Sequence, residues 1–238
     1  MAKNTIQEIK AGQTGTGLLI EHDGYISMSE GKNKTLMESY KQLNESGDGS
    51  FHCPYPFIVD AVFQKFGIEN ANGRIYPEHI LKRQVEIYQK RINERYAYGE
   101  LNHPSDSTID LGRIAMNIVE LHWEGSTLVG KLEIITSRGF RETGICSTFG
   151  DQTANLLLNG LKIGVSSRGL GSVETKMGKL IVQDDFEIIC WDVVSDPSTN
   201  NAFIKREQDD MNLWVEGKTE TKKDTLLEKL NKIDVELL

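Results

Sequence analysis

Apolar residues recur at every second position over two neighbouring stretches in the middle of the chain. One stretch covers residues 114–118 and the other covers residues 128–134, and turn-forming residues at 123–126 separate them. Alternation with a period of two is typical of half-buried strands. The two stretches therefore predict a β-hairpin.

Other apolar runs predict additional strands around this hairpin. Residues 57–63 have strand length, and residues 18–20 could add a strand from the N-terminal region. A second hairpin is predicted after position 164, with its turn near residues 176–179 and a return that ends at Val194.

A helical period appears in three segments. Pro77 and Glu78 mark the start of the first helix, which ends before Gly99, and its apolar face consists of Leu81, Val85, Tyr88 and Ile92. A second helix is predicted from Asp151, as its N-cap, to Leu161, with Ala154, Leu157, Leu158 and Leu161 inward. A terminal amphipathic helix, with a stripe of Leu226, Leu230, Ile233 and Leu237, either packs on the body or docks on a partner. Strands dominate, so the predicted fold class is α+β, a mostly antiparallel β-barrel or sandwich with surrounding helices.

Composition and charge narrow the class of protein. The chain has 238 residues, enough for one domain with extensions. Changes in composition predict a variable N-terminal extension at 1–50, a main domain at 51–204, and a polar linker with the terminal helix at 205–238. The net charge of −8 argues against a nucleic-acid partner, and no apolar run reaches the roughly 20 residues of a membrane helix. Three scattered cysteines and the lack of an HExxH-type motif predict reduced thiols in a cytosol, no metal and no cofactor.

Two short segments carry residues that suit acyl transfer. His103 lies between Gly99 and Pro104, which restrict the local backbone, and the serine pair Ser166 and Ser167 lies about sixty residues later. A histidine base beside a serine nucleophile would form two parts of a hydrolase site. Strand alternation favours Ser167 on the apolar face and Ser166 on the other, without deciding which is the nucleophile.

The residues after the serine pair are candidates for supporting the site. Gly169 would let backbone amides turn toward an oxyanion, and Arg168 either holds that segment or forms a surface ion pair. The alternative is a Ser-Ser-Arg turn that bonds only to its own backbone.

Asp192 is the candidate third member of the site. It shares one face of a predicted strand with apolar residues, where a carboxylate is costly unless it is paired. Orienting a histidine would satisfy it. Asp110 is a weaker candidate for the same role, and Asp192 could also be solvated at the end of its strand.

Together these segments resemble the prohead (head maturation) proteases of tailed bacteriophages, especially the contractile-tailed branch. The similarity covers about residues 55–204 and rests on six segments: Asn72–Pro77, Gly99–Pro104, Leu111–Ile114, Leu128–Leu132, Gly164–Ser172 and Asp192–Pro197. It implies a serine endopeptidase with a herpesvirus assemblin-like fold. By position, the resemblance implies that His103 is the general base, Ser166 the nucleophile and Asp192 the third member. Herpesvirus enzymes have a second histidine in the third role, and none follows Ser166 here, so the resemblance requires either an acidic third member or a dyad.

The resemblance also implies a biological setting. Such enzymes lie inside the assembling prohead in the host bacterial cytoplasm, and a homo-oligomer is compatible with this setting. They cleave scaffold, core and major capsid proteins and often themselves, after glutamate in Ile/Leu-x-Glu contexts. This chain contains such tripeptides at residues 6–8, 19–21 and 226–228. The alternatives are a non-catalytic capsid-assembly or scaffold-binding module with the same barrel, in which His103 and Ser166 would lie apart, and an esterase with a deep apolar pocket.

Overall fold

The computed structural model describes residues 6–26, 51–104 and 106–195. The chain divides into two units, residues 1–202 and 203–238, and the second unit lies wholly outside the described residues. The predicted linker and terminal helix therefore lie outside them too, and the domain boundaries inferred from the sequence stay predictions.

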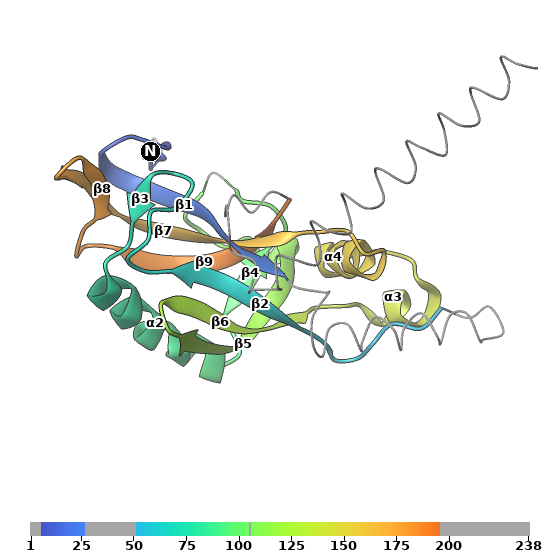
Figure 1. Ribbon diagram of the computed structural model, residues 1–238. Helices are drawn as coiled ribbons and strands as arrows, with labels where there is room; N and C mark the ends of the chain where they lie inside the picture. Colours follow the sequence, from blue (N-terminus) through green and yellow to red (C-terminus); the bar gives the residue numbers. More distant parts are fainter. Residues whose placement is uncertain (1–5, 27–50, 105, 196–238) are drawn as a thin grey trace, which may run out of the picture. The chain divides into compact units, whose positions relative to one another are not determined.

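Nine strands in the described part of the chain form one sheet that curls into a half-barrel (Figure 1). Its order is β3-β8-β7-β1-β2-β6-β5-β4, and β9 also pairs with β7. The strands are β1 (Gly15–Ile26), β2 (Phe57–Lys65), β3 (Arg74–Ile75), β4 (Tyr98–Glu100), β5 (Ile114–Glu124), β6 (Thr127–Ile134), β7 (Gly164–Lys176), β8 (Lys179–Val182) and β9 (Glu187–Val194). Every strand pair is antiparallel except β3 with β8. The structure thus confirms a mixed fold made mostly of strands, including the predicted hairpin β5–β6.

A short connection joins β4 at the end of the sheet to β9. Leu101 forms an isolated parallel bridge with Val193, and the amide of Asn102 donates to the Val193 carbonyl over 2.8 Å. The loop that follows β4 is therefore held beside β9, although the two strands are far apart in the sequence.

The first helix is α2 (Glu78–Asn93), which packs against β5 and β9 (Figure 1). All four residues of its predicted apolar face are buried. Tyr88 from this face packs edge-on against Trp191 of β9, which also meets Phe63 of β2. This aromatic cluster joins the helix to two strands of the sheet and fixes β9 in the core.

The second helix begins and ends earlier in the sequence than predicted. It is α4 (Phe149–Leu158), and its N-cap is Thr148, whereas Asp151 forms the other half of a capping box. Leu161 lies beyond the end of the helix and is 53% exposed, so its inward placement was wrong. A short helix, α3 (Arg138–Thr143), was not predicted.

Asp151 also links the two short helices. Its carboxylate accepts hydrogen bonds from the amides and hydroxyls of Ser137 and Ser147 at 2.7–3.0 Å. Burial alone would raise the pKa of Asp151, but these hydrogen bonds outweigh burial and lower the pKa below its ordinary value.

The predicted second hairpin consists of three strands. β7 turns at residues 177–178 into the short β8, and the chain then leaves the ladder before β9 begins. β8 pairs with the second half of β7, and β9 pairs with its first half. The break at residues 183–186 lets Phe186 pack into the space beside Gly169 and Gly171. No helix among the described residues is long and apolar enough to span a membrane.

Candidate active site

Ser166 lies on β7 directly opposite Asp192 of β9. The antiparallel register pairs the Cα atoms of these two residues, and both side chains are buried. Asp192 is therefore paired inside the protein rather than solvated at a strand end. The neighbouring apolar positions on the face predicted for it, among them Ile188 and Cys190, are buried as well.

The loop after β4 brings His103 to the same place. A Cβ atom on Gly99 would lie 2.2 Å from the Trp191 carbonyl, so the absence of a side chain lets β4 approach β9. Asn102 then adopts a left-handed conformation with φ of 64°, which asparagine tolerates better than most residues. These two features direct the chain so that the imidazole of His103 reaches across to Asp192 and Ser166.

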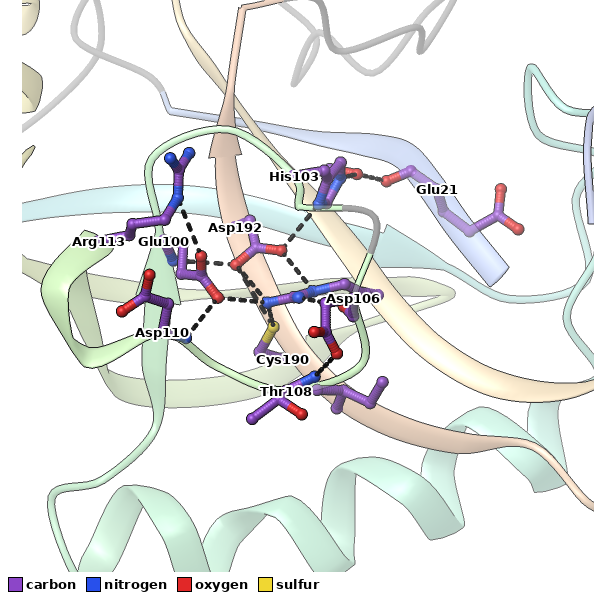
Figure 2. Close-up of polar contacts among 12 residues, drawn as sticks. Glu21, Glu100, His103, Asp106, Thr108, Asp110, Arg113, Cys190 and Asp192 are labelled. Atoms are coloured by element: carbon purple, nitrogen blue, oxygen red, sulfur yellow. Dashed lines mark hydrogen bonds and ion pairs between the residues drawn. The ribbon is translucent and has the colours of Figure 1, made fainter. Parts of the chain in front are cut away.

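The three side chains form a continuous chain of hydrogen bonds (Figure 2). His103 Nδ1 lies 2.8 Å from Asp192 Oδ2, and His103 Nε2 contacts the Ser166 hydroxyl. The second carboxylate oxygen of Asp192 accepts the amide of Glu100 over 2.9 Å. A carboxylate fixed in this way holds an imidazole with one nitrogen toward the serine, which suits proton transfer from a hydroxyl.

Arg168 lies beneath this chain of hydrogen bonds, fully buried between two carboxylates. Its Nε is 3.0 Å from Asp192 Oδ2, and its Nη2 is 2.9 Å from Glu100 Oε1. Its Nη1 donates to the Asp106 carbonyl over 2.6 Å, which ties the His103 loop down. The arginine is thus neither a surface residue nor part of a turn, and it connects Asp192, Glu100 and the loop that carries the imidazole.

Burial affects two ionisable groups in this cluster. Burial disfavours the charged guanidinium, but the adjacent Asp192 carboxylate and the hydrogen bonds to Cys190 and Glu100 outweigh burial and raise the pKa of Arg168. Burial, reinforced by the Asp192 carboxylate, raises the pKa of Cys190 well above its usual range. The cluster therefore holds a permanent cation and a neutral thiol.

The serine segment is part of strand β7, with a bulge between Arg168 and Gly169, and does not form the Ser-Ser-Arg turn that was the alternative. Ser167 is buried and lies opposite Trp191, and Gly169 lies opposite Ile188 within the same ladder. Gly169 makes room for Phe186, because a Cβ atom there would lie 2.4 Å from that ring. The glycine is explained by packing, and a role for Ser167, Arg168 and Gly169 in supporting an oxyanion stays a prediction.

Asp110, the weaker candidate for the third role, lies elsewhere in the network. Its carboxylate caps the 3-10 turn η1 (Leu111–Arg113) by accepting the Gly112 amide over 2.8 Å. Its own amide donates to Glu100 Oε1 over 3.1 Å. Asp110 therefore shapes the loop around Glu100.

Two further residues contact the site and were not assigned a role from the sequence. The amide of Glu100 donates to Asp192, and its carboxylate accepts a hydrogen bond from Arg168. The carbonyl of Glu21 on β1 accepts the Ser166 hydroxyl proton. Glu100 can be recognised in the sequence as a charged residue in a short strand of otherwise buried residues. The contact of Glu21 with the site cannot be predicted without knowing that β1 pairs with β7.

Comparison with known proteins decides the family. The model of the family described as prohead core protein serine protease matches residues 18–212. The chain belongs to this family. The resemblance seen in its motifs is thereby confirmed, and the chain is a serine protease of phage prohead assembly.

Two relatives show how far the similarity extends. The prohead core protein protease of Enterobacteria phage T4 is 32% identical over 164 residues, which are 67% of this chain and 74% of that protein. The structure of the bacteriophage T4 capsid assembly protease matches with a TM-score of 0.57 at 25% identity, covering 75% of this chain and 98% of that one. Within the described residues of this protease, no group of three or more His, Cys, Asp or Glu side chains is arranged to hold a metal ion.

Proposed function

We propose that the protease is an endopeptidase in which Ser166 is the nucleophile, His103 the general base and Asp192 the residue that orients the base. The observation that carries this proposal is the chain of hydrogen bonds from Ser166 through both nitrogens of His103 to Asp192. A non-catalytic assembly module would not need the imidazole and the hydroxyl in contact. An esterase is not favoured by any contact of the site.

Each of the three residues has a step in the mechanism that we propose. The Ser166 hydroxyl gives its proton to His103 Nε2 as its oxygen attacks the scissile carbonyl carbon, and Asp192 stabilises the imidazolium that forms. The imidazolium then gives the proton to the leaving amine. Water, activated by the same imidazole, hydrolyses the acyl-enzyme and regenerates the serine. We retain the backbone of Ser167, Arg168 and Gly169 as the candidate support of the oxyanion.

The substrates we propose are prohead proteins. The T4 relative is a prohead core protein protease, so core proteins are the first class to test. We extend the proposal to scaffold and major capsid proteins, to cleavage after glutamate, and to the chain itself, all inside the prohead in the host cytoplasm. The net charge of −8 offers no general surface for nucleic acid.

Turnover of a purified prohead core protein by five proteins tests this mechanism. We expect wild type and Ser167→Ala to cleave it, and Ser166→Ala and His103→Ala to lose at least about 1,000-fold in rate. Asp192→Asn is expected to be strongly impaired, because the amide no longer holds the correct tautomer. An active Ser166→Ala with an inactive Ser167→Ala would overturn the choice of nucleophile, and normal cleavage by all variants would overturn the mechanism.

A further inference from the structure

The strand that carries Ser166 also carries an arginine that contacts the elements holding the other two residues of the proposed site. Arg168 follows Ser166 by two positions on β7, so the two side chains lie on the same face of the sheet. Ser166 lies opposite Asp192 of β9, and Arg168 lies opposite Cys190, two positions before it. The arginine is therefore next to the proposed site by the register of the strands.

One guanidinium contacts both of the elements that must be aligned with Ser166. Toward β9, Arg168 Nε lies 3.0 Å from Asp192 Oδ2, the same oxygen that faces His103 Nδ1. Toward the His103 loop, Arg168 Nη1 donates to the Asp106 carbonyl over 2.6 Å. A guanidinium is planar and holds its donors at fixed angles. These two contacts therefore set the distance between the carboxylate and the loop that carries the imidazole.

Glu100 holds the guanidinium on its other side. Its Oε1 accepts Arg168 Nη2 over 2.9 Å, and its Oε2 lies 3.3 Å from Arg113 Nε. Its amide donates to Asp192 Oδ1, and Figure 2 shows both carboxylates pointing into the same space. Cations and anions thus alternate from Arg113 through Glu100 and Arg168 to Asp192, so each of the two buried carboxylates faces a cation.

The side chain of Arg168 is directed into the protein and not toward a substrate. It has no exposed surface, and all three of its nitrogens face protein groups. Besides the contacts with Asp192, Asp106 and Glu100, its Nη2 lies 3.1 Å from Cys190 Sγ. A side chain held in this way acts on the reaction through Asp192. This role is separate from the oxyanion support that we retain for the backbone of residues 167–169.

From these contacts we infer that Arg168 is a positioning residue of the protease, which holds the Asp192 carboxylate and the His103 loop against Ser166, with Glu100 holding the guanidinium. The inference rests on the proposed function, since it takes His103 as the base and Asp192 as the residue that orients it. Catalysis by an oriented base depends on alignment, and a displacement of about 1 Å can cost about 100-fold in rate. Loss of the positioning residue should therefore slow the chemical step and leave substrate binding unchanged.

Arg168→Lys tests the inference, because lysine keeps the positive charge but loses the planar fork. A single ammonium group cannot reproduce the spacing between the contacts with Asp192 and with the Asp106 carbonyl. On a prohead core protein we expect kcat to fall about 100-fold, with KM within about 2-fold of wild type. The rates are measured at a temperature at which a thermal scan shows each variant to be folded, so loss of the fold does not enter kcat.

The matched control is the same substitution in an ion pair outside the site. Arg95 is 67% exposed and pairs with Glu133 over 2.6 Å, so Arg95→Lys should keep the kcat of wild type. Glu100→Gln is a second test that leaves both Arg168 and the amide bond to Asp192 in place. It removes the charge that holds the guanidinium, and we expect kcat to fall about 10-fold without a change in KM. Its control is Glu133→Gln, which should keep kcat.

Proton NMR separates positioning from stability. The proton on His103 Nδ1, bonded to Asp192, should give a downfield signal in wild type that is missing in His103→Ala. In Arg168→Lys we expect this signal to weaken or disappear while the rest of the spectrum stays that of a folded protein. Arg95→Lys should retain the signal.

The outcomes distinguish this inference from the proposed function. A folded Arg168→Lys protein with kcat within about 3-fold of wild type overturns the inference, and so does a loss confined to KM. If Arg168→Lys does not fold, Glu100→Gln decides by the same two criteria. Each of these results leaves the proposed function standing, whereas an active Ser166→Ala counts against the proposed function itself.

Discussion

Arg168→Met removes the positive charge between two buried carboxylates while keeping most of the length of the side chain. The guanidinium faces Asp192 and Glu100 at 3.0 and 2.9 Å, and the arginine and both acids have no exposed surface. In the variant, Asp192 and Glu100 remain buried close together without this counter-charge. We therefore expect a large loss of stability.

The contacts set the magnitude of this loss. Breaking a buried ion pair by removing one partner costs about 3–5 kcal/mol, because the remaining charge stays desolvated. For a domain of this size, each kcal/mol lowers Tm by about 2–4 °C, so a fall of about 6–20 °C is expected. Charge is the main cause, since methionine fills much of the same volume.

Urea unfolding followed by circular dichroism measures the free energy of unfolding, and a thermal scan measures Tm. Arg138→Met is the matched control. Arg138 is 83% exposed and pairs only across one helical turn with Glu142, so its loss should leave both quantities unchanged. The double variant Arg168→Met/Glu100→Gln should recover at least about 1 kcal/mol relative to Arg168→Met, because one of the two buried carboxylate charges that faced Arg168 is gone.

Two results would refute this reasoning. A free energy of unfolding for Arg168→Met within about 1 kcal/mol of wild type would show that the cluster is not held by charge pairing. A double variant less stable than Arg168→Met by the full cost of the second change would show that repulsion between Glu100 and Asp192 is not the cause.

Three further changes test the geometry around the site. Asn102→Gly should keep the activity on a core protein, whereas Asn102→Val should lower kcat/KM about 10-fold, because a branched residue resists a φ of 64°; equal rates would contradict this. Gly99→Ala should lower Tm by more than about 5 °C, because its Cβ atom would lie 2.2 Å from the Trp191 carbonyl, whereas Gly139→Ala, with no contact closer than 4.0 Å, should not. Asp151→Asn should destabilise the protease at neutral pH. Because the pKa of Asp151 is lowered in the folded state, its ionised carboxylate stabilises the fold above the unfolded-state pKa of about 4, and this stabilisation is lost as pH falls through the folded-state pKa. The difference in the free energy of unfolding between Asp151→Asn and wild type should therefore shrink in acid. A difference that stays constant with pH would refute the assignment.

The sequence predicted the side chains of the site better than their surroundings. Asp192 was found because a carboxylate interrupts an apolar strand face, and it is indeed buried and paired. The packing of Gly169 could not be predicted, because glycine favours both turns and close packing, and only the position of Phe186 shows the close contact. Phe186 contacts Gly169 only in the folded sheet, so no local sequence pattern predicts this contact.

The wrong start of the helix α4 had a different cause. Thr148 and Asp151 form a capping box, and both residues of that pattern are visible in the sequence. A cap at Asp151 alone shifts the predicted helix toward Leu161. Glu21 could not be recognised in advance, since a Leu-x-Glu tripeptide is common and its meaning depends on β1 lying beside β7.

The bridge that joins Leu101 to Val193 has a consequence for the order of events after synthesis. His103 is separated from Ser166 by 63 positions and from Asp192 by 89, so the hydrolytic centre depends on contacts between distant parts of the chain. Contacts of such high sequence separation form late, after local helices and hairpins. β9 is the last strand of the sheet to leave the ribosome, and no His103–Asp192 contact can exist before it. The three side chains of the proposed site therefore come together only after β9 has joined the sheet.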